Sequence, residues 1–94
     1  MVFETESYIE KVIGDYARSK SCINFKFSSP SRKGVPDRIF MFNGRVMFIE
    51  FKRRGKKTTP LQNYTIGTIR AQGIVVNVID NVLDGKECID EFVN

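Results

Sequence analysis

The pair Asn43-Gly44, between two short apolar runs, constrains the fold more than any other feature of this sequence. The first run, IFMF, spans residues 39–42, and the second run, VMFI, spans residues 46–49. Both central residues of a two-residue type I′ turn need a positive φ, and Asn followed by Gly is well suited to that need. The pattern therefore predicts a β-hairpin whose two strands are joined by Asn43 and Gly44.

Three charged side chains gather at the open end of this hairpin. The two-residue turn fixes the register, so that Asp37 lies directly opposite Glu50. Side chains alternate between the faces of a strand, which adds Lys52 to the face that carries both carboxylates. Two like charges opposite each other destabilise a sheet, so this arrangement needs compensation. A shared proton, a salt bridge to Lys52 or a divalent cation could each supply it, and the spacing fits an ordinary ion cluster as well as a metal site.

Both faces of the hairpin strands are apolar, which predicts a central pair of strands covered on both sides. The charged residues at the open end are then exceptions in a buried sheet, where polar groups are either paired or functional. One face carries Ile39, Met41, Val46 and Phe48, and the other carries Phe40, Phe42, Met47, Ile49 and Phe51.

The rest of the chain predicts three helices and two further strands. The first helix has apolar side chains at amphipathic spacing and Thr5 as a possible N-cap, and the second begins with Thr59 as N-cap and Pro60 as its first residue. The expected helices span residues 4–19, 59–71 and 81–93, and the further strands span residues 22–27 and 74–79.

This order, α-β-β-β-α-β-α, predicts an α/β fold of the mixed α+β kind, with helices packed on a four-stranded mixed sheet. A helical crossover joins the second hairpin strand to the last strand, so these two strands should be parallel.

Length and composition favour one domain over residues 1–94. The chain has no histidine, which excludes triad hydrolases and His-ligated metal sites, and Cys22 and Cys88 are too few for a zinc framework. The acidic N-terminus does not resemble a secretory signal, and no apolar run is long enough to span a bilayer. We therefore expect reduced thiols, a cytoplasmic location and no membrane partner.

The net charge of +4 is unevenly distributed. A basic zone surrounds the hairpin, whereas the tail from Asp80 to Asn94 is acidic. Such a zone is typical of a polyanion partner, most often nucleic acid, although a solvated lysine-rich loop also fits residues 53–57. The nucleic-acid-binding candidates are Arg32, Lys33, Arg38, Arg53, Arg54, Lys56 and Lys57.

Four blocks of sequence resemble a known family. They are ESYIE at residues 6–10, GVPDR at 34–38, IEFK at 49–52 and TPLQ at 59–62. With these blocks on the expected elements, the chain resembles the PD-(D/E)xK nuclease superfamily and, within it, the small stand-alone phage or bacterial form of the VRR-NUC (virus-type replication–repair nuclease) domain. The likeness covers nearly the whole chain and implies a core like that of restriction endonucleases.

The resemblance implies a magnesium or manganese site. Asp37 and Glu50 would bind the metal, with the backbone carbonyl of Phe51 as a further ligand. Lys52 would position or deprotonate the attacking water and help to neutralise the scissile phosphate. Such a metal also agrees with the chemistry, because it lowers the pKa of a bound water where no histidine is present.

Two further elements would complete the site by the same resemblance. One glutamate of the first helix would join it, and the residues favour Glu6 over Glu10 only slightly. Gln62 would support the site from the start of the second helix.

The implied activity is that of a metal-dependent endonuclease that hydrolyses phosphodiester bonds in branched DNA, above all four-way (Holliday) junctions. The resemblance also implies a homodimer, no nucleotide cofactor, and a location in a bacterium or a phage-infected host cell. The alternative is a non-catalytic nucleic-acid-binding module that keeps the fold, with the carboxylates as a structural ion cluster.

Overall fold

The computed structural model describes residues 3–94, and its elements follow the predicted order. Helix and strand ends differ from the predicted ends by no more than two residues, which is the usual uncertainty of such boundaries. The elements are α1 (Glu6–Ser19), β1 (Ile23–Lys26), β2 (Arg38–Phe42), β3 (Arg45–Phe51), α2 (Pro60–Ala71), β4 (Val75–Ile79) and α3 (Val82–Phe92).

The hairpin of β2 and β3 has the predicted turn and register. Asn43 and Gly44 have φ values of 50° and 76°, as a type I′ turn requires. Phe42 pairs with Arg45, and the ladder runs without a bulge to the pair formed by Arg38 and Ile49. Continued by one residue, this register brings positions 37 and 50 opposite each other.

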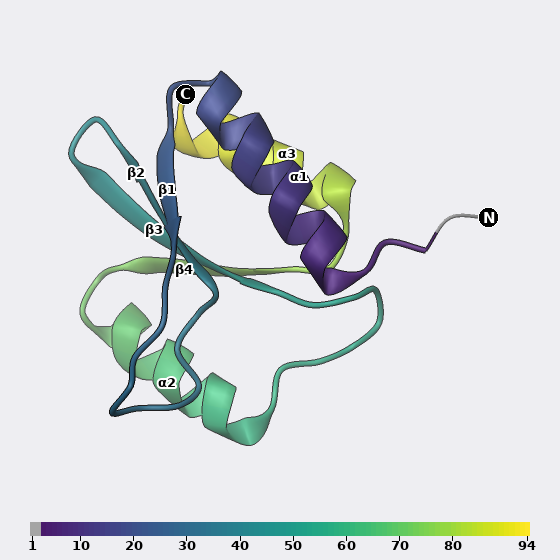
Figure 1. The fold of residues 1–94 in the computed structure, drawn as a ribbon. Coiled ribbons are helices and arrows are strands. Elements are labelled where there is room, and N and C mark those ends of the chain that lie inside the picture. Colours follow the sequence, from purple (N-terminus) through teal and green to yellow (C-terminus); the bar gives the residue numbers. More distant parts are fainter. Residues whose placement is uncertain (1–2) are drawn as a thin grey trace.

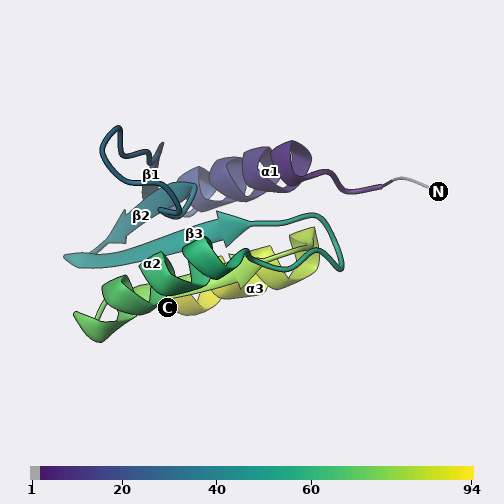
Figure 2. The same ribbon diagram turned by 90° about the horizontal axis from the view of Figure 1, so that it is seen from below.

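All four strands form one sheet in the order β1-β2-β3-β4. The strand pairs β1/β2 and β2/β3 are antiparallel, whereas β3 and β4 are parallel. Figure 2 shows the arrows of β3 and β4 pointing the same way, with α2 as the connection between them. The prediction of a mixed sheet with a helical crossover is therefore confirmed.

Polar side chains fix where each helix begins. The side chains of Thr5, Thr59 and Asn81 each accept a hydrogen bond from a backbone N–H in the first turn of the helix that follows. The cap of α2 is a full capping box, because Gln62 also accepts a hydrogen bond from the backbone N–H of Thr59 at 2.9 Å. The expected caps Thr5 and Thr59 are thus confirmed.

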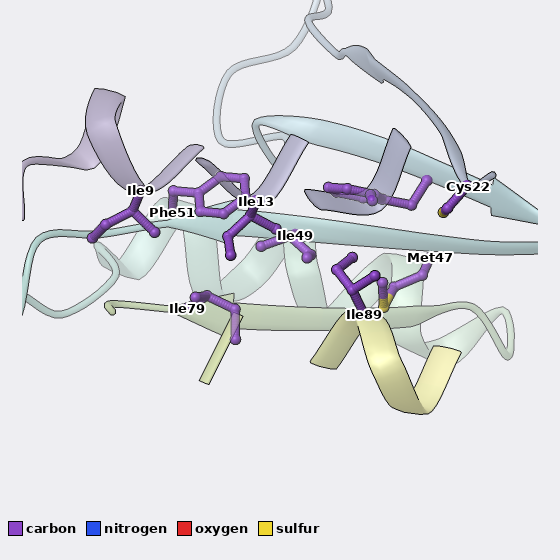
Figure 3. Packing of buried hydrophobic residues seen from close by; sticks show 10 residues of the cluster. Ile9, Ile13, Cys22, Met47, Ile49, Phe51, Ile79 and Ile89 are labelled. Carbon is purple, nitrogen blue, oxygen red and sulfur yellow. The ribbon is translucent and has the colours of Figure 1, made fainter. Parts of the chain in front are cut away.

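The main core lies on the face of the sheet that α1 and α3 cover. Figure 1 shows these two helices side by side, with α2 apart from them beyond the sheet. Figure 3 shows how α1, the sheet and α3 contribute to one apolar cluster. Its buried members are Ile9, Ile13, Ala17, Cys22, Phe40, Met47, Ile49, Phe51, Ile79 and Ile89.

The second face of the hairpin is less covered than the sequence predicts. α2 packs mainly against β4. Consequently Ile39, Met41, Val46 and Phe48 are only partly buried. One helix is too narrow to cover four strands, whereas two helices cover the opposite face.

Cys22 and Cys88 are both free thiols. No helix within residues 3–94 has the length and apolar character needed to cross a bilayer.

The close approach of α1 and α3 depends on Gly85. A Cβ at this position would lie 2.5 Å from Cδ1 and 2.6 Å from Cγ1 of the fully buried Ile13. We therefore expect Gly85→Ala to lower the free energy of unfolding by about 1–3 kcal/mol, measured by urea denaturation. Gly67→Ala in α2 is the matched control. A Cβ there meets nothing within 4 Å, so it should raise stability by about 0.5–1 kcal/mol, and the same sign for both variants would contradict the packing described.

Candidate active site

The open end of the hairpin gathers the three charged residues that the sequence singles out. Asp37 directly precedes β2, Glu50 lies in β3 and Lys52 directly follows β3. Glu50 and Lys52 are 3% and 6% exposed. The ladder to β4 continues here, because the backbone N–H of Lys52 donates to the carbonyl of Ile79 at 2.9 Å. Strand pairing thus fixes the backbone positions of Asp37, Glu50 and Lys52.

Backbone groups hold Asp37 in place from two sides. Its carboxylate Oδ2 accepts a hydrogen bond from the N–H of Phe51 at 2.8 Å, and its carbonyl accepts one from the N–H of Phe27 at 2.8 Å. The donor to Oδ2 belongs to the strand that carries Glu50. The two carboxylates therefore lie near each other because of the hairpin register, as the sequence predicts.

One oxygen of Glu50 is paired and the other is not. Oε2 lies 3.5 Å from the Lys52 ammonium and accepts a hydrogen bond from Nε2 of Gln62 at 2.9 Å. Oε1 is buried and has no hydrogen-bond partner. Almost every buried polar atom in a folded protein is hydrogen-bonded, so an orphaned carboxylate oxygen calls for an explanation.

Burial and the neighbouring acids raise the pKa values of both carboxyl groups. The pKa of Glu50 rises to about 7, first because the group is buried and second because Asp37 carries a negative charge nearby, while Lys52 opposes the shift. Burial also raises the pKa of Asp37, and the charges of Glu10 and Glu6 add to that effect. The N–H of Phe51 and the ammonium of Lys52 lower it. The site therefore carries more negative charge than its one buried ammonium compensates.

This surplus of negative charge fits a hard divalent cation. Magnesium usually binds through one or two carboxylates and keeps several of its water ligands. Asp37 and Oε1 of Glu50 provide such a pair. Within residues 3–94, no cluster of three or more His, Cys, Asp or Glu side chains is placed to hold a metal, so a third side-chain ligand would have to move to reach the ion.

The two glutamates of α1 have different surroundings. Oε2 of Glu10 lies 3.0 Å from the guanidinium of Arg38 and 3.1 Å from the ammonium of Lys26. Arg38 also donates to Oδ1 of the buried Asn24 at 2.9 Å. Glu6, in contrast, lies where its charge raises the pKa values of both Asp37 and Glu50. The charges of both glutamates raise the pKa of Asp37, with Glu10 the larger of the two, but Glu10 is held in a polar network within the fold.

Six of the seven basic candidates lie on exposed loops. Arg53, Arg54, Lys56 and Lys57 follow β3, and Arg32 and Lys33 lie in the loop between β1 and β2. The structure does not bring Arg38 together with them, because its side chain is only 13% exposed and is bound by Glu10 and Asn24. Asn24 was missed at the sequence level. Its position in the alternating strand at residues 22–27, as the one inward-facing amide, is the signal that could have identified it.

The raised pKa of Glu50 predicts how stability depends on pH. Between its unfolded value near 4.5 and its folded value of about 7, the folded protein binds more protons than the unfolded chain. Stability should therefore fall as pH rises through this window. In a metal-free buffer, we expect the free energy of unfolding from pH 5 to pH 8 to fall by roughly 2 kcal/mol more for the wild type than for Glu50→Gln. Equal falls for the two proteins in urea titrations would contradict the burial of a titrating Glu50.

Comparison with known proteins gives a relative and a fold. No protein-family model matches the chain. A protein of Acyrthosiphon pisum secondary endosymbiont phage 1, named "Putative nuclease p44", is 40% identical over 77 residues, which cover 81% of this chain and 83% of that protein.

Two solved structures have the same fold. One, described as a VRR_NUC domain, has a TM-score of 0.85 and 22% identity and covers 93% of this chain and 96% of its own. The other, a VRR_NUC domain protein, has a TM-score of 0.79 and 17% identity and covers 97% of this chain and 89% of its own. The chain therefore belongs to the family of the phage protein p44, and its fold is that of the VRR-NUC domain.

Proposed function

We propose that this protein is a magnesium- or manganese-dependent endonuclease that hydrolyses phosphodiester bonds in branched DNA, with four-way (Holliday) junctions as the preferred substrate. The observation that carries the proposal is the pairing of the partly buried Asp37 with the buried Glu50, with Lys52 beside them and Oε1 of Glu50 left without a partner. The name of the phage relative, a nuclease, supports the same chemistry.

Each residue of the site has a separate task in this proposal. Asp37 and Glu50 would hold the ion, together with the carbonyl of Phe51, and such an ion supplies charge to the phosphate and acidity to a water. Lys52 would orient the attacking water as an ammonium and add a second positive charge beside the phosphate, or in its neutral form it would take up the proton of that water. Gln62 holds Oε2 of Glu50, so Oε1 would be the oxygen available to the ion.

The carboxylate that α1 contributes is Glu6 in this proposal. Glu10 is already bound by Arg38 and Lys26, and removing it from those partners would leave a guanidinium inside the fold with one partner fewer. The charge of Glu6 acts on both Asp37 and Glu50, and its move to the ion would break none of the ion pairs found among residues 3–94.

The exposed basic loops would hold the DNA backbone. Arg53, Arg54, Lys56 and Lys57 lie directly after the site in the chain, and Arg32 and Lys33 extend the positive surface. Contacts of this kind bind phosphates without reading sequence, which suits an enzyme that recognises a shape.

Cleavage assays test the proposal directly. With duplex, flap, fork and four-way junction substrates, the wild type should cut the junction best, in magnesium or manganese and not in a chelating buffer. Lys52→Ala and Asp37→Ala should each reduce the cleavage rate by at least about a hundredfold, because each removes a group that acts on the transition state. Full activity of Asp37→Ala would refute the proposed chemistry.

The non-catalytic alternative predicts a different response of the wild type and of Asp37→Ala to manganese. If the acids are only an ion cluster, manganese should not raise the melting temperature of the wild type, and no substrate should be cut. If they hold an ion, manganese should raise that temperature, and the rise should disappear in Asp37→Ala.

A homodimer also belongs to the proposal, because a four-way junction presents paired arms. The supporting surface is the face of β1 that α2 does not cover, where Ile23 and Phe25 are 55% and 57% exposed. We expect Phe25→Glu to shift the protein from dimer to monomer in sedimentation experiments without loss of folding. A wild type that stays monomeric at high concentration and still cuts junctions would refute the dimer.

A further inference from the structure

A cleft of about 790 Å³ lies beside the candidate site, between two segments that are far apart in the sequence. The first wall is formed by residues 3–5, directly before α1, and the second by residues 53–56, directly after β3. Figures 1 and 2 show the two segments close together at the same end of the molecule.

Both walls are anchored to the connection between β4 and α3. Oε1 of Glu4 accepts a hydrogen bond from the N–H of Val82 at 3.1 Å, which holds the first wall. Oδ2 of Asp80 accepts one from the N–H of Gly55 at 3.3 Å, which holds the second. The cleft itself is lined by three cationic side chains, Arg53, Arg54 and Lys56, against one carboxylate, Glu4, so its lining is positive overall.

The side chains that line the cleft combine one exposed aromatic ring with several positive charges. Phe3 is 82% exposed, although a phenyl ring gains free energy from being covered. Opposite it in the cleft lie Arg53, Arg54 and Lys56. A stacking ring together with a basic groove is how proteins bind single-stranded nucleic acid, with a base on the ring and the phosphates on the cations.

The cleft opens directly beside the proposed catalytic residues. Thr5, in the first wall, is the neighbour of Glu6, and Arg53, in the second wall, is the neighbour of Lys52. Adjacent Cα atoms are about 3.8 Å apart, so a strand in the cleft would run within a nucleotide or so of the phosphate at the site.

We propose that this cleft binds an unpaired nucleotide next to the scissile phosphate, with its base stacked on Phe3 and its phosphate held by Arg53, Arg54 and Lys56. The inference rests on the proposed nuclease function and adds the form of the substrate at the cut. Paired bases in a duplex are stacked on each other and cannot cover Phe3, whereas branch points and frayed ends provide unstacked bases. The cleft would thus favour substrates with such nucleotides over continuous duplex.

Binding assays in a chelating buffer separate this inference from cleavage. We would measure fluorescence anisotropy with a short oligothymidine and with a duplex of the same length, for the wild type, Phe3→Leu and Tyr8→Leu. Both variants replace an exposed aromatic ring by an aliphatic side chain, but only Phe3 lines the cleft. We expect Phe3→Leu to weaken oligothymidine binding at least about fivefold and to leave duplex binding unchanged, with no effect of Tyr8→Leu on either.

Two results would overturn the cleft, and neither depends on catalysis. Unchanged oligothymidine binding by Phe3→Leu would exclude stacking, and an equal loss of oligothymidine and duplex binding would exclude a preference for unpaired nucleotides. If the preference for oligothymidine depends on Phe3 but the protein cuts no substrate, the cleft binds unpaired nucleotides and the nuclease proposal is wrong. If cleavage depends on Asp37 but binding does not depend on Phe3, the nuclease proposal stands and the proposed role of the cleft is wrong.

Discussion

The repulsion between two carboxylates held on adjacent strands is the constraint on which the rest of this structure depends. The Asn43-Gly44 turn sets the register of β2 and β3, and that register brings Asp37 and Glu50 to the same end of the sheet. Burial first and the charge of Asp37 second raise the pKa of Glu50, and the buried ammonium of Lys52 opposes this shift without cancelling it. A local choice of turn residues therefore determines the electrostatics of a site several residues away.

The surrounding elements keep this unfavourable arrangement in place. β4 pairs with β3 up to Lys52, so the strand cannot move away to separate the charges. Arg38 binds Glu10 and Asn24 and so joins α1, β1 and β2 directly beside Asp37. Packing of α1 and α3 on the same sheet supplies the apolar burial that offsets the cost of the charged end. The apolar core thus lies on one face of the sheet, and the charged site lies at one end of it.

Much of the fold could be predicted from the sequence because its signals are local. The hairpin turn, the helix caps and the crossover connection each follow from a few neighbouring residues, and the structure agrees with all of them. The uncovered face of β1 and β2 was not predictable in this way, since an apolar strand pattern does not say how many helices are available to cover it. The pairing of Glu10 with Arg38 could not be predicted in this way either, because the two residues are 28 positions apart in the sequence.

Gln62 has two roles that together restrict what can occupy its position. Its amide oxygen closes the cap of α2, and its amide nitrogen donates to Glu50. A glutamate at position 62 could close such a cap equally well. Here, however, its carboxylate would lie against the buried carboxylate of Glu50, and the amide that donates to Glu50 would be lost. The first turn of α2 and the orientation of Glu50 therefore depend on one side chain. Unwinding of that turn would release the carboxylate, which links the integrity of a helix end to the shape of the site.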